Sequence, residues 1–508
     1  MKGLLSTRAS CAWMGVVVVG VIVMALVVGL QLVPRLTGGQ ELIDTAKPAL
    51  TDAAVKGEVG GTLLVSQYVD LADPLMTRKG RSREELGRLV TMIKRKTGVS
   101  AERARALLRR EAPHTEALLR AVPFSGVADE RRRLTAYLSK TLNITPEDLQ
   151  DELARTFPRI YQVLSELPSA TAGWYDVPGV EGLTRFDGTP VKTMAQVRDY
   201  LRDDLVAAVE EEQDHFQSLA GSGGIGYIPW LLLVLGAGLA IFGFVHARWS
   251  ASHASGRVAW GAVVAVGVLV MILVGALQYF PRLTGADTTI AKLEPAFDEQ
   301  RVIGLRAGTD LIMQAARFGD PIMTGSGGAV EEVPKLMTFI SGRAGLSEAA
   351  VREQLTKAAP RTMALFDALP LSAVAEEVPH LVAVLSRKLR VGGDGLVRLL
   401  RKRTPGLAQA LLAVGPVTTG WENVPGSEGL KRFDAGTPVR TAPQFTEYLD
   451  LDVVPIFESG GKDLDKLAGT WPPVNVLPFV VAGVGGLLVI YGLAMLFFAT
   501  GTRASGYG

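Results

Sequence analysis

Apolar residues gather in four long runs, which are the strongest pattern in this chain of 508 residues. Each run is about as long as the roughly 20 apolar residues that a helix needs to cross the hydrocarbon of a bilayer. The second and third runs are separated only by a short polar segment, which suits a tight turn at a membrane surface. We therefore predict four transmembrane helices, at residues 12–33, 227–247, 258–280 and 474–499.

An apolar run near the N-terminus is also the pattern of a signal peptide. Here the run is longer than a typical signal sequence, and no cleavage pattern of small residues follows it closely. Its counterpart at 260–280 is internal and cannot be a signal. We expect the first run to remain as a transmembrane helix.

The short polar segments beside the runs predict the orientation. Residues 1–11, 248–257 and 500–508 carry basic side chains and no Asp or Glu. Segments with an excess of Lys and Arg tend to stay in the cytoplasm. We therefore expect a multi-pass plasma-membrane protein with cytoplasmic termini and a cytoplasmic central turn. Its two large segments, 34–226 and 281–473, would be extracytoplasmic ectodomains.

The two large segments have the periodicity of short helices. Apolar residues recur four positions apart, as at Leu134 and Leu138. Thr145 stands where a helix would begin, and Pro158 interrupts the pattern because proline lacks the N–H that a helix interior needs. The composition, 48% hydrophobic and 20% charged, fits a membrane protein with large water-exposed parts. We predict an all-α integral membrane protein with two mainly helical ectodomains.

The chain repeats itself with a period of 247 residues. Trp13 recurs as Trp260 and Trp174 as Trp421, each inside a longer match. Self-similarity at one period across a whole chain indicates repeat architecture, here a tandem duplication. The two ectodomains are therefore expected to be homologous.

A shorter repeat of 45 residues lies within each half. Each copy combines a glutamate, an apolar stripe at helical spacing and a proline, which predicts about three short helices. We expect the two copies of one half to fold into one compact bundle with their flanking segments. The equivalent residues are Glu85, Glu130, Glu332 and Glu377, and Pro113, Pro158, Pro360 and Pro405.

Small residues, not charged ones, recur inside the apolar runs. The run interiors hold no Asp, Glu, Lys or Arg, and intramembrane charge is the usual mark of ion pathways and proton relays. This pattern weighs against a coupled transporter. Small residues about four positions apart, such as Gly236 and Ala240, allow close helix contact. They predict either packing within a four-helix bundle or a homo-oligomer formed through these faces.

A loop near the end of each ectodomain is the most similar stretch between the halves. Residues 173–187 match residues 420–434 at 11 of 15 positions. Gly and Pro at this density predict a structured loop. The side chains with chemistry, our candidate binding residues, are Trp174, Glu181, Arg185 and Asp187 in the first half and Trp421, Glu428, Arg432 and Asp434 in the second.

This loop has two interpretations. In the architectural one, Trp fills the core, Arg pairs with a carboxylate, and Gly permits tight turns. In the binding one, the loop forms a pocket rim or partner surface, where Arg holds an anionic group in bidentate fashion and Trp stacks beside it. Loop residues are disproportionately functional, so the binding interpretation stays open.

Residue types needed for catalysis do not assemble into a pattern. The five histidines do not align between the halves, and Cys11 is the single cysteine. Glu181 and Asp187 offer an acid/base pair, but Arg185 between them favours a salt bridge. We predict a protein that is not an enzyme, with no cofactor and no metal.

Charge gives weak guidance to partners. The formal net charge of +2 indicates neither nucleic acid nor another polyanion. Residues 210–212 are three glutamates, which we interpret as a solvated helix face. The arginines within 103–110 and 131–133 give the first ectodomain a basic surface, which is either solvated or meets anionic envelope polymers or lipid headgroups.

Together these patterns predict a non-enzymatic membrane protein of the cell envelope. Its paired helical ectodomains would bind a partner protein, a lipid or an envelope polymer. The alternative is a transport or lipid-handling component with a passage between the two halves.

Overall fold

The computed structural model of the chain is helical. It describes residues 2–220, 225–249, 256–276, 280, 283, 286–434, 436–467 and 473–504. Within these ranges no strand forms, and the β-type contacts are two single bridges, Thr184 with Pro190 and Lys431 with Pro438. The all-α prediction is confirmed for this part of the chain. Most of the expected central turn and parts of the expected ectodomain boundaries lie outside the described residues.

Contacts divide the chain into two units, and each unit is built from both halves of the sequence. Unit 1 consists of residues 1–51, 208–299 and 456–508, and unit 2 of residues 52–207 and 300–455. Most residues of both expected ectodomains therefore belong to one unit.

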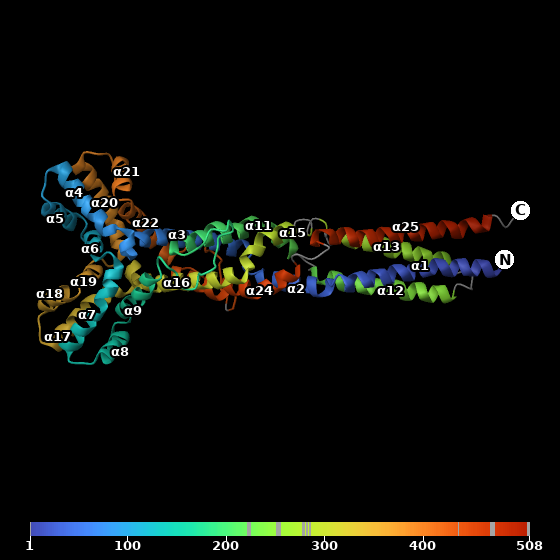
Figure 1. Cartoon of the computed structure of the whole chain (residues 1–508), viewed down its shortest axis with the longest axis horizontal. Helices are drawn as coiled ribbons and strands as arrows, with labels where there is room; N and C mark the ends of the chain where they lie inside the picture. Colours follow the sequence, from blue (N-terminus) through green and yellow to red (C-terminus); the bar gives the residue numbers. More distant parts are fainter. Residues whose placement is uncertain are drawn as a thin grey trace. The chain divides into compact units, whose positions relative to one another are not determined.

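Within the residues that the structure describes, unit 1 holds four helices that are each long and apolar enough to cross a membrane (Figure 1). No more than 33% of the most apolar stretch of any of them is buried within the protein. Large apolar surfaces that face outward along such helices are suited to contact with lipid. Their number equals that of the membrane-crossing helices predicted from the sequence. They are α1 (Lys2–Gly29), α12 (Ile228–Trp249), α13 (Gly256–Ala276) and α25 (Leu477–Ala504).

The apolar helices pack in pairs, α1 on α12 and α13 on α25. A Cβ atom added to Gly20 would lie 2.5 Å from the carbonyl oxygen of Gly236, and one added to Gly267 would lie 2.7 Å from that of Gly485. These glycines therefore let neighbouring backbones approach closely. Gly275, in contrast, has no atom within 4 Å of an added Cβ. Association of copies through such faces stays a prediction.

A buried polar cluster in unit 1 corrects one expectation. Glu212 is only 2% exposed, whereas the three glutamates at 210–212 were expected to be solvated. The hydroxyl of Thr289 donates to its carboxylate at 2.6 Å, and the ammonium group of Lys292 lies 2.5 Å away. Two of its partners, Thr289 and Lys292, lie about 80 residues away, and the third, His215, lies 3.2 Å away on the same helix as Glu212. The burial depends on the distant pair, which no local pattern in the sequence indicates. The other α-helices described in unit 1 are α2 (Leu32–Ala46), α11 (Ala207–Leu219), α15 (Ala286–Leu293) and α24 (Val454–Leu467).

Unit 2 is organised on two long helices that are 247 residues apart, α3 (Asp52–Met76) and α16 (Glu299–Met323). After each of them come two 45-residue repeats, and each repeat forms three helices. The first half supplies α4 (Ser82–Thr97), α5 (Ala101–Glu111), α6 (Pro113–Ala121), α7 (Phe124–Leu142), α8 (Pro146–Thr156) and α9 (Pro158–Ala172). The second half supplies α17 (Ala329–Ala344), α18 (Glu348–Ala358), α19 (Pro360–Asp367), α20 (Leu371–Leu389), α21 (Gly393–Arg403) and α22 (Pro405–Glu422).

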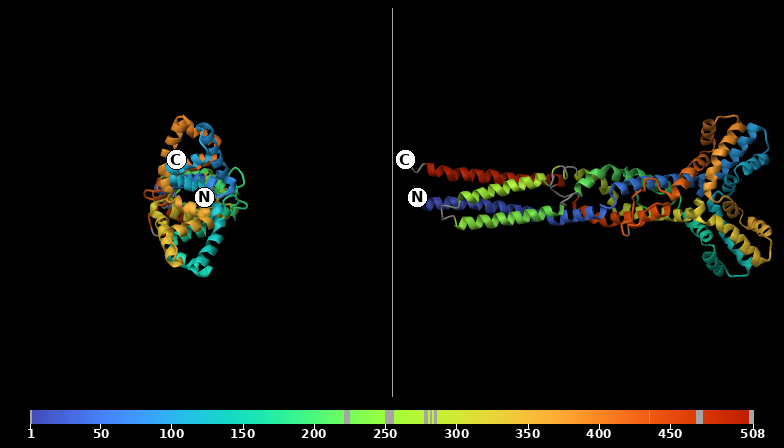
Figure 2. Two further views of the ribbon diagram at one scale, coloured as in Figure 1. Left: turned by 90° about the vertical axis from the view of Figure 1, so that its left-hand side faces the viewer. Right: turned by 180° about the vertical axis from the view of Figure 1, so that it is seen from behind.

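The repeats pair across the two halves, not within them. Helices α4–α6 pack with α20–α22, and helices α7–α9 pack with α17–α19. We call these groups lobe A and lobe B. The two lobes meet where α6 of lobe A packs on α19 of lobe B, and Figure 2 shows their other helices as two groups. In the core of lobe A, Leu89 and Ile93 of the first half cluster with Leu381 and Leu385 of the second. The expected bundle of two repeats from one half is therefore replaced by a reciprocal exchange. Helices α19 and α20 resemble a membrane span only as a pair bent by 75°, and they belong to different lobes.

Candidate functional site

The repeated loop folds in the same way in both halves. The N–H of Arg185 donates to the carbonyl of Thr189 at 2.8 Å, and Arg432 makes the equivalent bond to Thr437, also at 2.8 Å. Gly182 has a φ of +97°, a backbone conformation that glycine adopts without strain. The loop leads to α10 (Met194–Asp199) and the π-helix η2 (Tyr200–Val206), and its copy leads to α23 (Ala442–Tyr448) and the π-helix η6 (Leu449–Val453).

Each loop lies against the long helix of the other half. A Cβ added to Gly304 of α16 would lie 2.5 Å from the Cβ of Leu183 in the first loop. A Cβ added to Gly57 of α3 would lie 2.8 Å from a methyl carbon of Leu430 in the second loop. Glycine at these positions is what permits the close approach.

The two tryptophans are inside this packing. Trp174 is 0% exposed and Trp421 is 3% exposed. The indole N–H of Trp174 donates to Asp73 at 3.1 Å, and that of Trp421 to Asp320 at 3.5 Å. The ring of Tyr68 lies between them in contact distance, with centroids 6.4 and 5.4 Å away. Neither indole face is available at the surface for a stacked ligand.

The two loop arginines bind carboxylates of the π-helices. Arg185 donates two hydrogen bonds to Asp204, at 3.0 and 2.8 Å, and Arg432 pairs with Asp452. The hydrogen bond to Asp204 raises the pKa of Arg185. A bidentate pair uses the geometry that would otherwise hold an external anion. The structure thus places the Trp and Arg side chains as the architectural interpretation describes.

The four acidic candidates are exposed at the loop surface. Asp187 accepts the N–H of Thr189 at 2.8 Å, and this hydrogen bond lowers the pKa of Asp187. Asp434 lies 4.0 Å from Arg432, and Glu181 and Glu428 are solvent-exposed. The structure therefore does not gather the eight candidates into one pocket.

Four glutamates that the sequence marked only as repeat positions cap helices of the opposite half. Glu377 accepts the N–H groups of His114 and Thr115, at 3.0 and 2.8 Å, in the first turn of α6. Glu130 accepts the N–H of Thr362 in α19 at 2.9 Å. The N–H groups of a first turn have no partner in their own helix and favour negative charge. In the other two caps, Glu85 accepts the N–H of Leu407 and Glu332 that of Ile160.

A sequence signal for these caps exists. In all four repeats the glutamate stands 28 residues before the proline that begins the third helix, as with Glu85 and Pro113. The capped proline helix, however, belongs to the repeat with which the glutamate pairs in its lobe. The spacing marks the two positions but not the partner.

The pairing sorts charge between the lobes. Lobe A, residues 82–121 and 371–422, holds 17 Lys and Arg and 9 Asp and Glu, a net charge of +8. Lobe B, residues 124–172 and 329–367, holds 11 and 12, a net charge of −1. The basic surface that the sequence suggested is divided, because the arginines of α5 lie in lobe A and residues 131–133 lie in lobe B.

Among the residues that the structure describes, no group of three or more His, Cys, Asp or Glu side chains lies close enough together to hold a metal ion. Comparison with protein-family models, curated proteins and solved structures finds no match to this chain.

Proposed function

We propose that the chain is a non-enzymatic membrane protein of the cell envelope that binds an anionic envelope polymer through lobe A. In this proposal the chain arose by tandem duplication, and unit 1 anchors it in the plasma membrane with both termini in the cytoplasm. Unit 2 lies in the extracytoplasmic space. The observation that carries the proposal is the concentration of positive charge on one of two lobes with the same architecture.

The basic side chains of lobe A are all on its surface. All 17 of them are exposed, whereas 4 of the 9 acidic side chains, among them Glu85 and Glu377, are buried or half-buried. Glu85 and Glu377 are also occupied in capping helices. The outward charge of the lobe therefore exceeds its formal net charge.

Many of these basic groups have no carboxylate partner. Within the described residues, the four basic side chains of α21 (Arg398, Arg401, Lys402 and Arg403) make no ion pair. Other basic side chains lie on α5 and on the last turns of α4 and α20. Charge spread over four helices suits an extended polyanion, which gains affinity from many weak contacts and the release of counterions.

The test is salt-dependent binding of a polyanion to the full chain in lipid nanodiscs. Fluorescent polyphosphate and polyglutamate would be titrated against the wild type and against Arg103→Gln/Arg105→Gln/Arg398→Gln. If each exposed contact contributes about 0.2–1 kcal/mol, three contacts change the Kd by roughly 3- to 150-fold. We expect the triple variant to bind both polymers more weakly than the wild type, and its affinity to depend less steeply on the salt concentration.

The matched control removes three exposed charges from lobe B, in Lys140→Gln/Lys335→Gln/Arg343→Gln, and should bind like the wild type. Equal losses in both triple variants would contradict the proposal, because affinity would then follow total charge. Binding to phosphatidylglycerol vesicles without binding to either polymer would instead identify a lipid surface as the partner. Transport through a passage between the halves stays an alternative hypothesis.

A further inference from the structure

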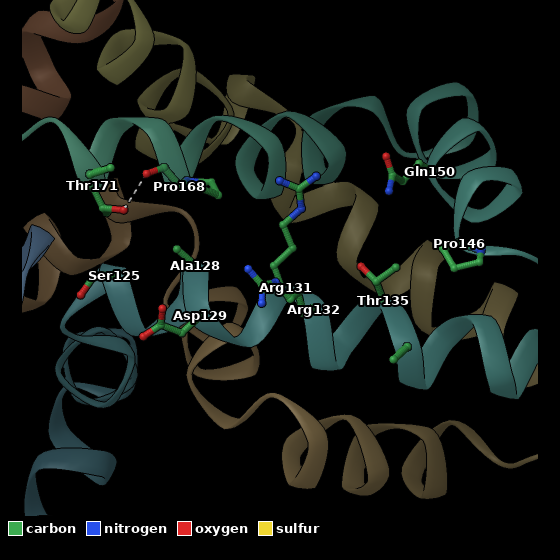
Figure 3. A pocket seen from close by; sticks show the side chains of 12 residues that line it. Ser125, Ala128, Asp129, Arg131, Arg132, Thr135, Pro146, Gln150, Pro168 and Thr171 are labelled. Atoms are coloured by element: carbon green, nitrogen blue, oxygen red, sulfur yellow. Dashed lines mark hydrogen bonds between the residues drawn. The ribbon is translucent and has the colours of Figure 1, made fainter. Parts of the chain in front are cut away.

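A second feature of unit 2 is independent of the basic surface of lobe A. Lobe B contains an open cavity of about 800 Å³ between α7, α8 and α9 (Figure 3). Small-molecule sites commonly have volumes of about 300–1,000 Å³. The polar side chains that line the cavity are Ser125, Asp129, Arg131, Arg132, Thr135, Gln150 and Thr171.

Two of the polar positions in the lining are polar in this repeat only. Arg131 occupies a position that is Leu86, Val333 or Val378 in the other three repeats. Thr135 likewise corresponds to Val90, Met337 and Val382. Both positions face the inside of the helical unit, and each carries an apolar residue in three repeats and a polar residue in the fourth.

The equivalent position in lobe A shows how apolar side chains pack between the same three helices of a repeat. There Val378 and Val382 line an apolar pocket of about 30 Å³ that also touches Leu89. That space is about the volume of one water molecule, so the apolar side chains fill it. In lobe B the same framework leaves a wide polar opening, although a leucine or valine at position 131 would suit the fold.

Positive charge in the cavity is only partly balanced by neighbouring carboxylates. Within the described residues, Arg131 and Arg132 make no ion pair, whereas the adjacent Arg133 lies 3.8 Å from Glu130. Glu130 is itself occupied with the first turn of α19. Asp129 is the carboxylate that lines the cavity, so two guanidinium groups face one acid.

We propose that this cavity binds a small molecule that carries a phosphate group. Guanidinium groups match the geometry of phosphate oxygens and form charge-assisted, bidentate hydrogen bonds with them. Two guanidinium groups suit a doubly charged phosphate better than a single carboxylate. The hydroxyls of Ser125 and Thr135 and the amide of Gln150 supply further hydrogen bonds, and Pro146 and Pro168 supply apolar walls for the rest of the molecule.

The phosphate could come from a soluble phosphate ester or from a phospholipid headgroup, and the test separates the two. Isothermal titration of the full chain in detergent would use glycerol 3-phosphate as the soluble probe and dihexanoyl phosphatidic acid as the lipid probe. We expect saturable binding of at least one probe, with one site per chain. Binding of the lipid probe alone assigns the site to a headgroup, and binding of both assigns it to the phosphate itself.

Variants place the binding in the cavity. Arg131→Val installs the residue that the equivalent repeat already carries, and we expect binding to weaken roughly tenfold or more, since hydrogen bonds between charged groups are lost. Arg132→Gln, at an exposed position, provides a second variant with little demand on folding. Arg133→Gln, next in sequence but outside the cavity, is the control and should bind like the wild type. The proposal is overturned if neither probe binds at millimolar concentration, or if the two cavity variants bind like the control.

Discussion

The cap that Glu377 provides is a contact between the two halves, so its removal probes the pairing of the repeats. The Glu377 carboxylate accepts hydrogen bonds from the N–H and the hydroxyl of Thr115 and from the N–H of His114, at 2.8, 2.9 and 3.0 Å. Its side chain is 14% exposed. Glu377→Ala removes the acceptor and leaves helix N–H groups without a partner, at a cost of about 2–4 kcal/mol.

The expected effect on thermal unfolding follows from the size of unit 2. With 156 residues from each half, about 2 °C of Tm is lost per kcal/mol, so the apparent Tm should fall by about 4–8 °C. Circular dichroism of the full chain in detergent measures this change. Glu376→Ala, at the exposed neighbouring position, is the matched control and should change the Tm by about 1 °C or less.

The pH dependence gives a second signature. Burial by itself would raise the pKa of Glu377, but the hydrogen bonds from Thr115 and His114 outweigh it and lower the pKa below the ordinary 4.5. A lowered pKa means that the stabilisation is present above pH 4.5 and is lost as the pH falls through the folded-state value. The difference between wild type and Glu377→Ala should therefore shrink below pH 4.5. A Tm loss no larger than that of Glu376→Ala would refute the cap.

Three further predictions concern close packing, buried charge and topology. A Cβ at Gly60 would lie 1.6 Å from a carbonyl oxygen of the opposite loop, so Gly60→Ala should lower the Tm by several degrees, whereas Gly87→Ala, with no atom within 4 Å, should leave it unchanged or raise it slightly. Burial raises the pKa of Glu58 to about 8. The free energy of unfolding should therefore decrease as the pH rises from 4.5 to 8, by up to about 5 kcal/mol. In melting curves recorded at different pH values, Glu58→Gln should show a smaller decrease. In a background without the native cysteine, a membrane-impermeant maleimide added to intact cells should label Arg105→Cys but not Ser255→Cys, and the reverse pattern would overturn the proposed topology.

The apolar helices and the three-helix repeats could be predicted because their signals are local. A run of about 20 apolar residues, or a stripe such as Leu134 and Leu138, is complete within one segment of chain. The proline positions also behaved as expected, since Pro113 and Pro158 each begin a helix and leave no N–H unsatisfied there.

The pairing of the repeats could not be predicted, because it is a choice among similar partners. Each repeat presents an equivalent apolar stripe, so Leu89 has suitable contacts in more than one other repeat, and sequence spacing does not rank them. The ion-pair partners of the loop arginines could not be predicted for a related reason. Arg185 was expected to pair with a nearby carboxylate, but its main partner is Asp204, which a π-helix places beside it.

The charge of the whole chain concealed the charge of its parts. A net charge of +2 argues against a polyanion when it is spread evenly, but pairing of repeats from opposite halves concentrates a net +8 on lobe A. Charge is therefore informative here only after the lobes are known.

The measurement that tests the account most directly is crosslinking between the halves in the native membrane. In lobe B the hydroxyl of Tyr137 lies 2.5 Å from the side-chain oxygen of Gln354. Tyr137→Cys/Gln354→Cys would be treated with a short thiol crosslinker and cleaved at a protease site inserted at 250–255. Reciprocal pairing predicts that the two halves then migrate together on a denaturing gel, and that Tyr137→Cys/Lys388→Cys, which spans the two lobes, leaves them separate. Separate halves in the first variant would contradict the pairing, and with it the division of charge on which the proposed function rests.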